Sequence, residues 1–438
     1  MVFRQFVDDD LGCASYLIGE EHSGEALLVD PAYAIEQCLV EADRLGVRIT
    51  RVLETHTHAD HVSGHGRLAL EHGATVGLHP AGNPEYPFEP LEDGSEIEVE
   101  SVRVRVLHTP GHRPEHCCFV VGDAVLTGDS LFVGSVARPD LAMQAHEGAE
   151  GLFYSLQRLL DLPDSYRVFP GHVAGSLCGS QMSADPSSTI GAERTHNPAL
   201  AIPLVDEFVA ESATINTPRP PNMARIVELN RGPFLGAPAP LEALVSAGGA
   251  TVLDVRPPDA HGAGHVPGAL NVPVSGGHFA TRAGFLLRPG ERIVLHASDR
   301  EERERAAQGL RKIGFLELDG YLAEPHTTET MAAVAVGELS GLLERDSVEL
   351  VDVRELDERD TGYIPGSVNI PYRLVRARAD QLPHDRPVVT ICESGARAAI
   401  AASVLAAAGL DAHPVLHGGI PDWEQNGNGT VHFRRCGA

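Results

Sequence analysis

The chain has 438 residues, which is enough for two to four domains at roughly 100–200 residues each. Its hydrophobic fraction of 43% and charged fraction of 22% are ordinary for a folded globular protein. The formal net charge of −27 and the pI near 5.1 argue against nucleic acid or an anionic membrane as a partner, because both require a basic face.

The first third of the chain alternates short β-rich runs with turn residues. Between these runs, residues 34–45 and 64–72 have helical patterns. A strand-rich region with interleaved helices, and with histidines at its strand ends, predicts an αβ/βα sandwich. The predicted strands are 26–29, 51–54, 75–78, 102–107, 117–121 and 124–126.

The densest motif comes directly after the second of these strands, where residues 56–61 hold three histidines and one aspartate. Further candidates follow later strands, and each has a glycine beside it that permits a tight turn. A turn at the end of a strand lets such side chains converge, so the pattern predicts a metal site. The candidate ligands are His56, His58, Asp60, His61, His112, Asp129 and His172.

The middle of the chain contains a proline-rich segment and then an internal repeat. Residues 198–240 are predicted to be an excursion of the first domain and then a linker. Residues 253–256 align with 351–354, and residues 265–273 with 363–371, both 98 positions apart. Each copy reads strand, loop, strand and a turn into a helix, which predicts an α/β domain with a parallel sheet. The predicted domains are therefore 1–238, 239–332 and 333–438.

The second copy of the repeat ends an apolar strand with a cysteine, Cys392, and then turns at Gly395 into an alanine-rich helix. Loop N–H groups and a helix N-terminus stabilise a thiolate, so Cys392 is the candidate nucleophile. Arg397 is predicted to brace this loop or to hold an anionic sulfur donor. The first copy has Ala297 and Glu302 at the corresponding positions, which predicts a catalytically inactive domain, a spacer or a docking module. The neighbouring His296 has no evident partner and is given no chemistry.

The N-terminal region, about residues 1–200, resembles the metallo-β-lactamase superfamily, and all seven ligand positions of that superfamily are filled. The resemblance leaves two readings. Persulfide dioxygenases bind one iron(II), whose ligands map onto His56, His112 and Asp129, with His58, Asp60, His61 and His172 around them. Glyoxalase-II-like hydrolases bind two zinc ions on the same set and attack a thioester.

Two features favour the dioxygenase reading. Arg138 and Asp140, an Arg-x-Asp element after Asp129, look like the dioxygenase branch and are candidate substrate contacts. Sulfur-handling domains also stand where glyoxalases carry a glutathione-binding tail.

Cys178, six residues beyond His172, is either a sulfur relay or a small buried residue. Cys13, Cys117 and Cys118 are expected in the core.

The repeats resemble the rhodanese family, with a Cys-x-x-Gly-x-Arg loop at residues 392–397. The resemblance implies that Cys392 accepts sulfane sulfur as a persulfide and passes it to a thiol. The fusion is similar to bacterial sulfide-detoxification proteins, so the expected partners are a persulfide, O2, thiosulfate and sulfite. The expected assembly is a homo-oligomer, a dimer or a tetramer. A non-enzymatic protein that binds persulfide is a third hypothesis.

The N-terminus has no apolar run of signal-peptide length, and no segment reaches the ~20 apolar residues that span a bilayer. The seven cysteines are few, odd in number and irregularly spaced. Such cysteines are typical of a reducing compartment, so we expect a bacterial cytoplasm and no membrane or nucleic-acid partner.

Overall fold

The computed structural model describes residues 2–20, 24–139, 144–173, 183, 185–212 and 218–432. The chain forms two compact units. The first unit comprises residues 1–238 together with 308–316, and the second comprises residues 239–307 and 317–438.

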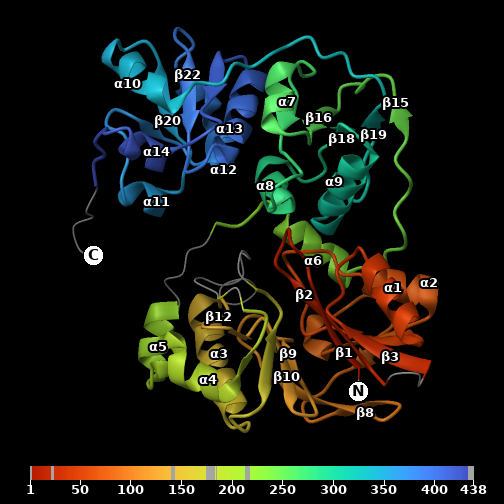
Figure 1. The fold of residues 1–438 in the computed structure, drawn as a ribbon. Coiled ribbons are helices and arrows are strands. Elements are labelled where there is room, and N and C mark those ends of the chain that lie inside the picture. Colours follow the sequence, from red (N-terminus) through yellow and green to blue (C-terminus); the bar gives the residue numbers. More distant parts are fainter. Residues whose placement is uncertain are drawn as a thin grey trace. The chain divides into compact units, whose positions relative to one another are not determined.

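The first unit is built on two six-stranded sheets (Figure 1). The strand order is β1-β2-β3-β4-β5-β6 in one sheet and β14-β13-β10-β9-β8-β7 in the other. Side chains from both sheets, among them Tyr16, Leu27, Val104 and Phe119, form one buried core between them. The strands are β1 (Val2–Val7), β2 (Ala14–Gly19), β3 (Gly24–Val29), β4 (Val47–Leu53), β5 (Thr75–Leu78), β6 (Glu89–Pro90), β7 (Glu96–Val99), β8 (Val102–His108), β9 (Cys117–Val121), β10 (Ala124–Gly128), β13 (Arg167–Pro170) and β14 (Ser188–Thr189), with a separate hairpin of β11 (Leu131–Phe132) and β12 (Ser135–Val136).

Helices pack against the other face of each sheet. Helix α1 buries Cys38, Ala42 and Leu45, which share one helix face, and it ends at Gly46 in the left-handed conformation. These side chains join a second core with the first sheet, and α3, α4 and α5 form a third core with the second sheet. The predicted αβ/βα sandwich is confirmed. The helices are α1 (Glu36–Leu45), α2 (His65–His72), α3 (Ala145–Leu160), α4 (Ile190–His196), α5 (Val205–Ser212) and α6 (Met223–Arg231), with short 3-10 turns at Pro80–Gly82 and Pro198–Ala201.

Two details differ from the expectation. Strand β4 begins at Val47 rather than at residue 51, because Val47 and Ile49 are buried and alternate with the exposed Arg48. The proline-rich stretch 198–240 contains α5 and α6 as packed helices, whose buried side chains include Phe208 and Ile226. Proline content alone did not reveal them.

The second unit contains two parallel sheets, one for each copy of the repeat. The strand orders are β15-β19-β18-β16-β17 and β21-β20-β22-β23. Within the unit the copies are joined by polar contacts such as the bidentate pair of Arg376 with Glu291, at 2.7 and 2.8 Å. The strands are β15 (Ala243–Leu244), β16 (Thr251–Asp254), β17 (Leu270–Asn271), β18 (Ile293–His296), β19 (Gly320–Leu322), β20 (Glu349–Asp352), β21 (Val368–Asn369), β22 (Val388–Ile391) and β23 (Ala412–Pro414).

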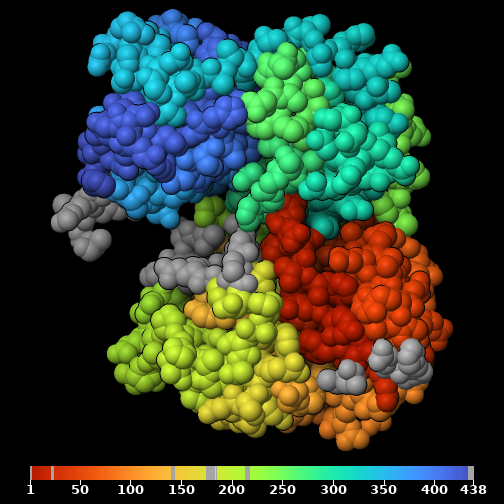
Figure 2. Space-filling view, in the orientation of Figure 1, coloured from red at the N-terminus to blue at the C-terminus, as the bar shows by residue number. Residues whose placement is uncertain are grey.

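The helices of the two repeats follow the strands in the expected α/β order. They are α7 (Pro258–Ala263), α8 (Phe279–Leu286), α9 (Arg300–Lys312), α10 (Val336–Glu344), α11 (Leu356–Asp360), α12 (Tyr372–Arg378), a 3-10 turn at Ala379–Gln381, α13 (Ala396–Ala407) and α14 (Ile420–Gln425). Figure 2 shows side chains filling the spaces that the ribbon leaves open within each unit. Among the described residues, no helix has the length and apolar character needed to cross a bilayer.

Candidate metal centre and sulfur-transfer loop

The first site is built by loops that follow strands of both sheets. Strands β3 and β4 run side by side in parallel, so Asp30 at the end of β3 lies next to the loop after β4. The Asp30 Oδ1 atom accepts a hydrogen bond from the main-chain N–H of Thr55 at 2.7 Å. This bond fixes the point at which the histidine-rich loop departs.

Three of the predicted ligands converge from three different loops. His56 follows β4, His112 follows β8, and Asp129 follows β10. The Nε2 atoms of His56 and His112 lie 4.0 and 3.6 Å from Asp129 Oδ2. One ligand atom from each residue lies within 4.8 Å of the others, and all three side chains are buried.

Hydrogen bonds fix which ring nitrogen of each histidine faces Asp129. Thr55 Oγ1 donates to Asp30 Oδ2 at 2.8 Å, so it accepts the hydrogen bond from His56 Nδ1 at 2.9 Å. His112 Nδ1 donates to the main-chain oxygen of Arg138 at 3.0 Å. Both Nε2 atoms are therefore left with lone pairs. Burial lowers the pKa of both histidines, which favours the neutral form that binds metals.

Asp129 completes a donor set that fits a divalent cation. Its Oδ2 atom is buried and has no hydrogen-bond partner, while its Oδ1 atom accepts from His172 Nδ1 at 2.8 Å. Burial by itself would raise the pKa of Asp129, but the charge and hydrogen bond of His172 outweigh it and hold that pKa well below its usual range. A buried carboxylate oxygen beside two imidazole lone pairs is the arrangement of a 2-His-1-carboxylate metal site.

His172 lies between two carboxylates. Its Nε2 atom contacts Asp60 Oδ2 at 2.8 Å, opposite the bond from Nδ1 to Asp129. Burial lowers the pKa of His172, but the two carboxylates outweigh it and raise that pKa to about 10. Gly171 permits this approach, since a Cβ atom there would lie 2.6 Å from Asp129 Oδ1.

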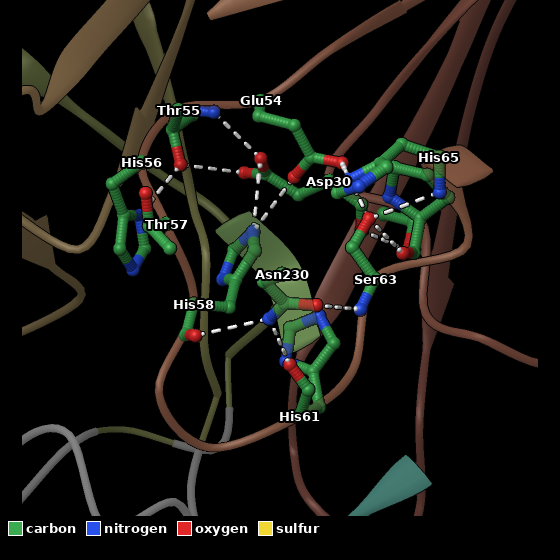
Figure 3. Close-up of polar contacts among 12 residues, drawn as sticks. Asp30, Glu54, Thr55, His56, Thr57, His58, His61, Ser63, His65 and Asn230 are labelled. Carbon is green, nitrogen blue, oxygen red and sulfur yellow. Dashed lines mark hydrogen bonds and ion pairs between the residues drawn. The ribbon is translucent and has the colours of Figure 1, made fainter. Parts of the chain in front are cut away.

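His58, Asp60 and His61 form a second group, with ligand atoms that also lie within 4.8 Å of one another. The Nε2 atom of His58 lies 3.2 Å from both Asp30 Oδ1 and Glu54 Oε2 (Figure 3). Four buried atoms of this group have no hydrogen-bond partner, namely both ring nitrogens of His58, Asp60 Oδ1 and His61 Nε2. The group is therefore suited to a second cation.

Sequence reasoning missed several residues that hold this site. Besides Asp30 and Thr55, it missed His116, whose Nε2 accepts the main-chain N–H of Asp129 at 3.0 Å and whose Nδ1 contacts the main-chain oxygen of Thr109 at 3.1 Å. Burial and the neighbouring His112 lower the pKa of His116 to about 3. Its only sequence signal was its position four residues after His112.

The remaining predicted residues of this region lie partly inside and partly outside the described residues. Arg138 is buried, and its main-chain oxygen orients His112. Asp140 and Cys178 lie outside the described residues. Cys13, Cys117 and Cys118 are buried, and burial raises the pKa of each thiol, in Cys118 to about 11.

The second site surrounds Cys392, which follows β22 and is 1% exposed. The main-chain N–H of Gly395 donates to Cys392 Sγ at 3.1 Å, so the loop places a hydrogen-bond donor on the sulfur. Gly395 has φ of 96°, and a Cβ atom there would lie 1.9 Å from the oxygen of Leu416. The turn into α13 therefore requires glycine.

Arg397, predicted to brace this loop or to hold an anionic donor, forms an ion pair with Glu358. Its two terminal nitrogens, Nη1 and Nη2, each donate to one carboxylate oxygen of Glu358 at 2.6 Å. This pair joins the start of α13 to α11.

In the first repeat, N–H groups of the corresponding loop donate to carboxylates of the same loop and of α9. Ala297 stands in the place of the cysteine, and the N–H of Ser298 donates to Glu302 Oε2 at 2.8 Å. The N–H of Glu302 donates in turn to Asp299 Oδ1 at 2.9 Å.

His296 was expected to have no partner, but its Nδ1 lies 3.6 Å from Asp254 Oδ2. Asp254 comes from the neighbouring strand β16, a contact that sequence spacing does not show.

Comparisons with known proteins match separate parts of the chain. Residues 8–172 match the Metallo-beta-lactamase superfamily, and residues 237–322 and 335–426 match the Rhodanese-like domain. A mitochondrial persulfide dioxygenase ETHE1 from Bos taurus is 29% identical over 235 residues, which cover 52% of this chain and 87% of the relative. A hydroxyacylglutathione hydrolase from Xylella fastidiosa is 31% identical over 240 residues, covering 54% and 84%.

A crystal structure provides the longest of these matches. It is a metallo-beta-lactamase from Staphylococcus aureus subsp. aureus COL, 30% identical, with a TM-score of 0.68. The match covers 74% of this chain and 99% of that one.

Proposed function

The chain belongs to the metallo-β-lactamase superfamily and carries two rhodanese-like domains, and from this premise we propose that it is an iron(II)-dependent persulfide dioxygenase with an attached sulfurtransferase. The overall conversion takes R–S–SH, O2 and H2O to R–SH, sulfite and two protons. The outer sulfur is oxidised and dioxygen is reduced. The substrate is a persulfide of a low-molecular-weight thiol.

One observation carries the dioxygenase proposal. His56, His112 and Asp129 bring two imidazole nitrogens and one unpartnered carboxylate oxygen together, while His172 is held between two carboxylates through both of its nitrogens. This set is typical of mononuclear iron(II) oxygenases. The persulfide dioxygenases among the relatives, at 27–29% identity, support the same activity.

The residues around the three ligands have defined tasks. Thr55 and the main-chain oxygen of Arg138 orient the two imidazoles, and His172 holds the outer oxygen of Asp129. Burial of the three side chains limits the access of bulk water. Iron(II), held by His56, His112 and Asp129, would supply open positions for the persulfide and for dioxygen.

The sulfurtransferase proposal depends on Cys392. Its thiolate attacks the outer sulfur of a persulfide or of thiosulfate, and the S–S bond of the donor breaks. The donor leaves as a thiolate or as sulfite, and Cys392 keeps the sulfur as a persulfide. The N–H of Gly395, 3.1 Å from Sγ, stabilises negative charge on the sulfur during this step.

A second candidate is a dinuclear zinc hydrolase of thioesters. The second group of His58, Asp60 and His61, with its buried unpartnered atoms, favours this reading, and so does the hydroxyacylglutathione hydrolase relative. In this candidate His172 would have to release one of its two carboxylates before it could bind a metal.

The test measures oxygen uptake by anaerobically purified, iron(II)-loaded protein on addition of glutathione persulfide or coenzyme A persulfide. We expect uptake with sulfite formation, abolished in His112→Ala and retained in Cys392→Ser. His196→Ala, which removes an exposed imidazole of α4 whose Nδ1 contacts the main-chain oxygen of Ala192, is the control. One iron per chain is expected by elemental analysis. Two zinc ions per chain, no oxygen uptake and thioester hydrolysis would replace the dioxygenase with the hydrolase.

A further inference from the structure

Helix α6 lies outside the part of the chain that matches the metallo-β-lactamase superfamily, residues 8–172. It nevertheless places one buried polar side chain against the histidine-rich loop. This side chain is Asn230, near the end of the helix and 3% exposed.

The carboxamide of Asn230 holds three main-chain groups of the loop (Figure 3). Its Nδ2 atom donates to the main-chain oxygen of His58 at 3.0 Å and to that of His61 at 2.8 Å. Its Oδ1 atom accepts the N–H of Ser63 at 2.8 Å. The loop has no regular secondary structure between β4 and α2, so these buried groups depend on partners from elsewhere.

The end of α6 is itself fixed to the first unit. The main-chain oxygen of Arg231 accepts the N–H of Glu85 at 2.7 Å. Just beyond the helix, Phe234 stacks on Tyr86 with ring centroids 4.7 Å apart. The hydroxyl of Tyr33 donates to the main-chain oxygen of Gly236 at 2.7 Å. Asn230 therefore acts from a position that is attached to the first unit by these contacts.

The three bonds set the curvature of the loop. The carbonyls of His58 and His61 converge on one nitrogen, so the chain between them must bend. Asp60 sits in this bend and contacts His172 at 2.8 Å, and His172 in turn contacts Asp129 at 2.8 Å. The curvature therefore reaches Asp129, one of the three converging ligands.

We propose that Asn230 is a positioning residue for the metal centre: its carboxamide sets the loop curvature that aims His58, Asp60 and His61 and thereby determines how tightly the site binds a divalent cation. This inference rests on the proposed metal-dependent function. It assigns to α6, a helix in the proline-rich stretch, a direct part in building the centre.

The experiment uses the full chain and Co(II), whose visible absorption reports the ligand geometry. Asn230→Asp keeps the shape of the side chain but replaces the donor that faces two carbonyls with an oxygen. Asn230→Ser keeps a smaller polar group. The matched control is Asn222→Ala, because Asn222 is also a buried asparagine of this helix region but donates to the main-chain oxygen of Ile313 at 2.6 Å.

We expect the Co(II) affinity of Asn230→Asp, measured by competition with a chelator, to fall by about 10- to 100-fold, as for other partners of metal-ligating residues. The absorption bands should shift, circular dichroism should stay at the wild-type level, and Asn222→Ala should stay within about twofold of the wild-type affinity.

Wild-type affinity and spectrum in both Asn230 variants would overturn the proposal, and so would an equal loss in Asn222→Ala. If Asn230→Asp does not fold, Asn230→Ser decides by the same criteria. If neither variant folds, Asn230 is required for the stability of the fold, and the proposal that it positions the metal centre is overturned. Because the readout needs neither persulfide nor oxygen, wild-type protein that binds Co(II) but consumes no oxygen would refute only the dioxygenase.

Discussion

Replacing Thr55 by valine tests whether the chain from Asp30 through Thr55 to His56 orients a metal ligand. Valine keeps the branched shape of threonine, so the change opens no cavity, but it removes the hydroxyl. His56 Nδ1 then loses its partner at 2.9 Å, and Asp30 Oδ2 loses its donor at 2.8 Å. Asp30 keeps the N–H of Thr55 on its other oxygen.

The magnitude follows from these two losses. Removing the outer hydrogen bond of a ligating histidine costs about 10- to 100-fold in metal affinity, which corresponds to about 1.4–2.7 kcal/mol. The buried, unpartnered Asp30 oxygen costs a further ~1–3 kcal/mol in the stability of the metal-free protein. Both effects should therefore be seen in one variant, the first by chelator competition for Co(II) and the second by denaturant unfolding.

Thr50→Val is the matched control, because Thr50 lies on β4 and its hydroxyl contacts Glu25 at 3.5 Å, away from the ligands. We expect its metal affinity to equal that of the wild type. If Thr55→Val bound Co(II) within twofold of the wild type, or if Thr50→Val lost as much, the orienting role of Thr55 would be refuted.

Three further predictions follow from the glycine turns and the first repeat. In Gly171→Ala the new Cβ atom would lie 2.6 Å from Asp129 Oδ1, so we expect less than half of the wild-type metal content by elemental analysis. Wild-type metal content would show that the turn shifts to accommodate the Cβ atom without displacing Asp129. In Gly395→Ala the new Cβ atom would clash with the oxygen of Leu416, and alanine would be strained at a φ of 96°. We expect the rate of sulfur transfer from thiosulfate to fall at least about tenfold while oxygen uptake persists. Equal loss of both activities would contradict the separation of the two sites. Ala297→Cys in a Cys392→Ser background should restore no sulfur transfer, since Glu302 stands in the place of Arg397 and its carboxylate, bonded to the N–H of Ser298, would repel an anionic sulfur donor. A measurable rate would show that the first loop still accepts a donor.

The sequence was most informative where function lies on adjacent residues. The concentration of histidines at residues 56–61 and the glycines beside His112, Asp129 and His172 were enough to predict the ligand candidates. The cysteine loop was equally local. The 98-residue repeat predicted the two parallel-sheet domains, because both copies keep the same turns.

The partners of those residues could not be predicted, because they come from distant parts of the chain. Asp30 is 25 residues from Thr55, and Asn230 is 172 residues from His58. A single buried aspartate or asparagine has no pattern of its own, and only the packed fold shows what it contacts. The proline-rich stretch misled for a similar reason, since composition indicates turns but does not show which apolar side chains are buried between them.

The two repeats separate what the fold requires from what the chemistry requires. In both repeats an arginine forms a bidentate ion pair with the aspartate that ends a central strand. Arg256 pairs with Asp254 of β16, and Arg354 pairs with Asp352 of β20. In both, an asparagine amide, of Asn271 or of Asn369, donates to the main-chain oxygens of that pair.

The loops after the next strand differ instead. In the second repeat an N–H faces the sulfur of Cys392, whereas in the first the N–H groups of Ser298 and Glu302 bond to carboxylates. Retention of the buried scaffold without the loop is what stability alone would require, since an unpaired buried aspartate is costly whether or not a sulfur is transferred. The first repeat therefore keeps what its fold requires, including contacts with the second repeat such as that of Glu291 with Arg376, and its lack of sulfur-transfer activity stays a prediction.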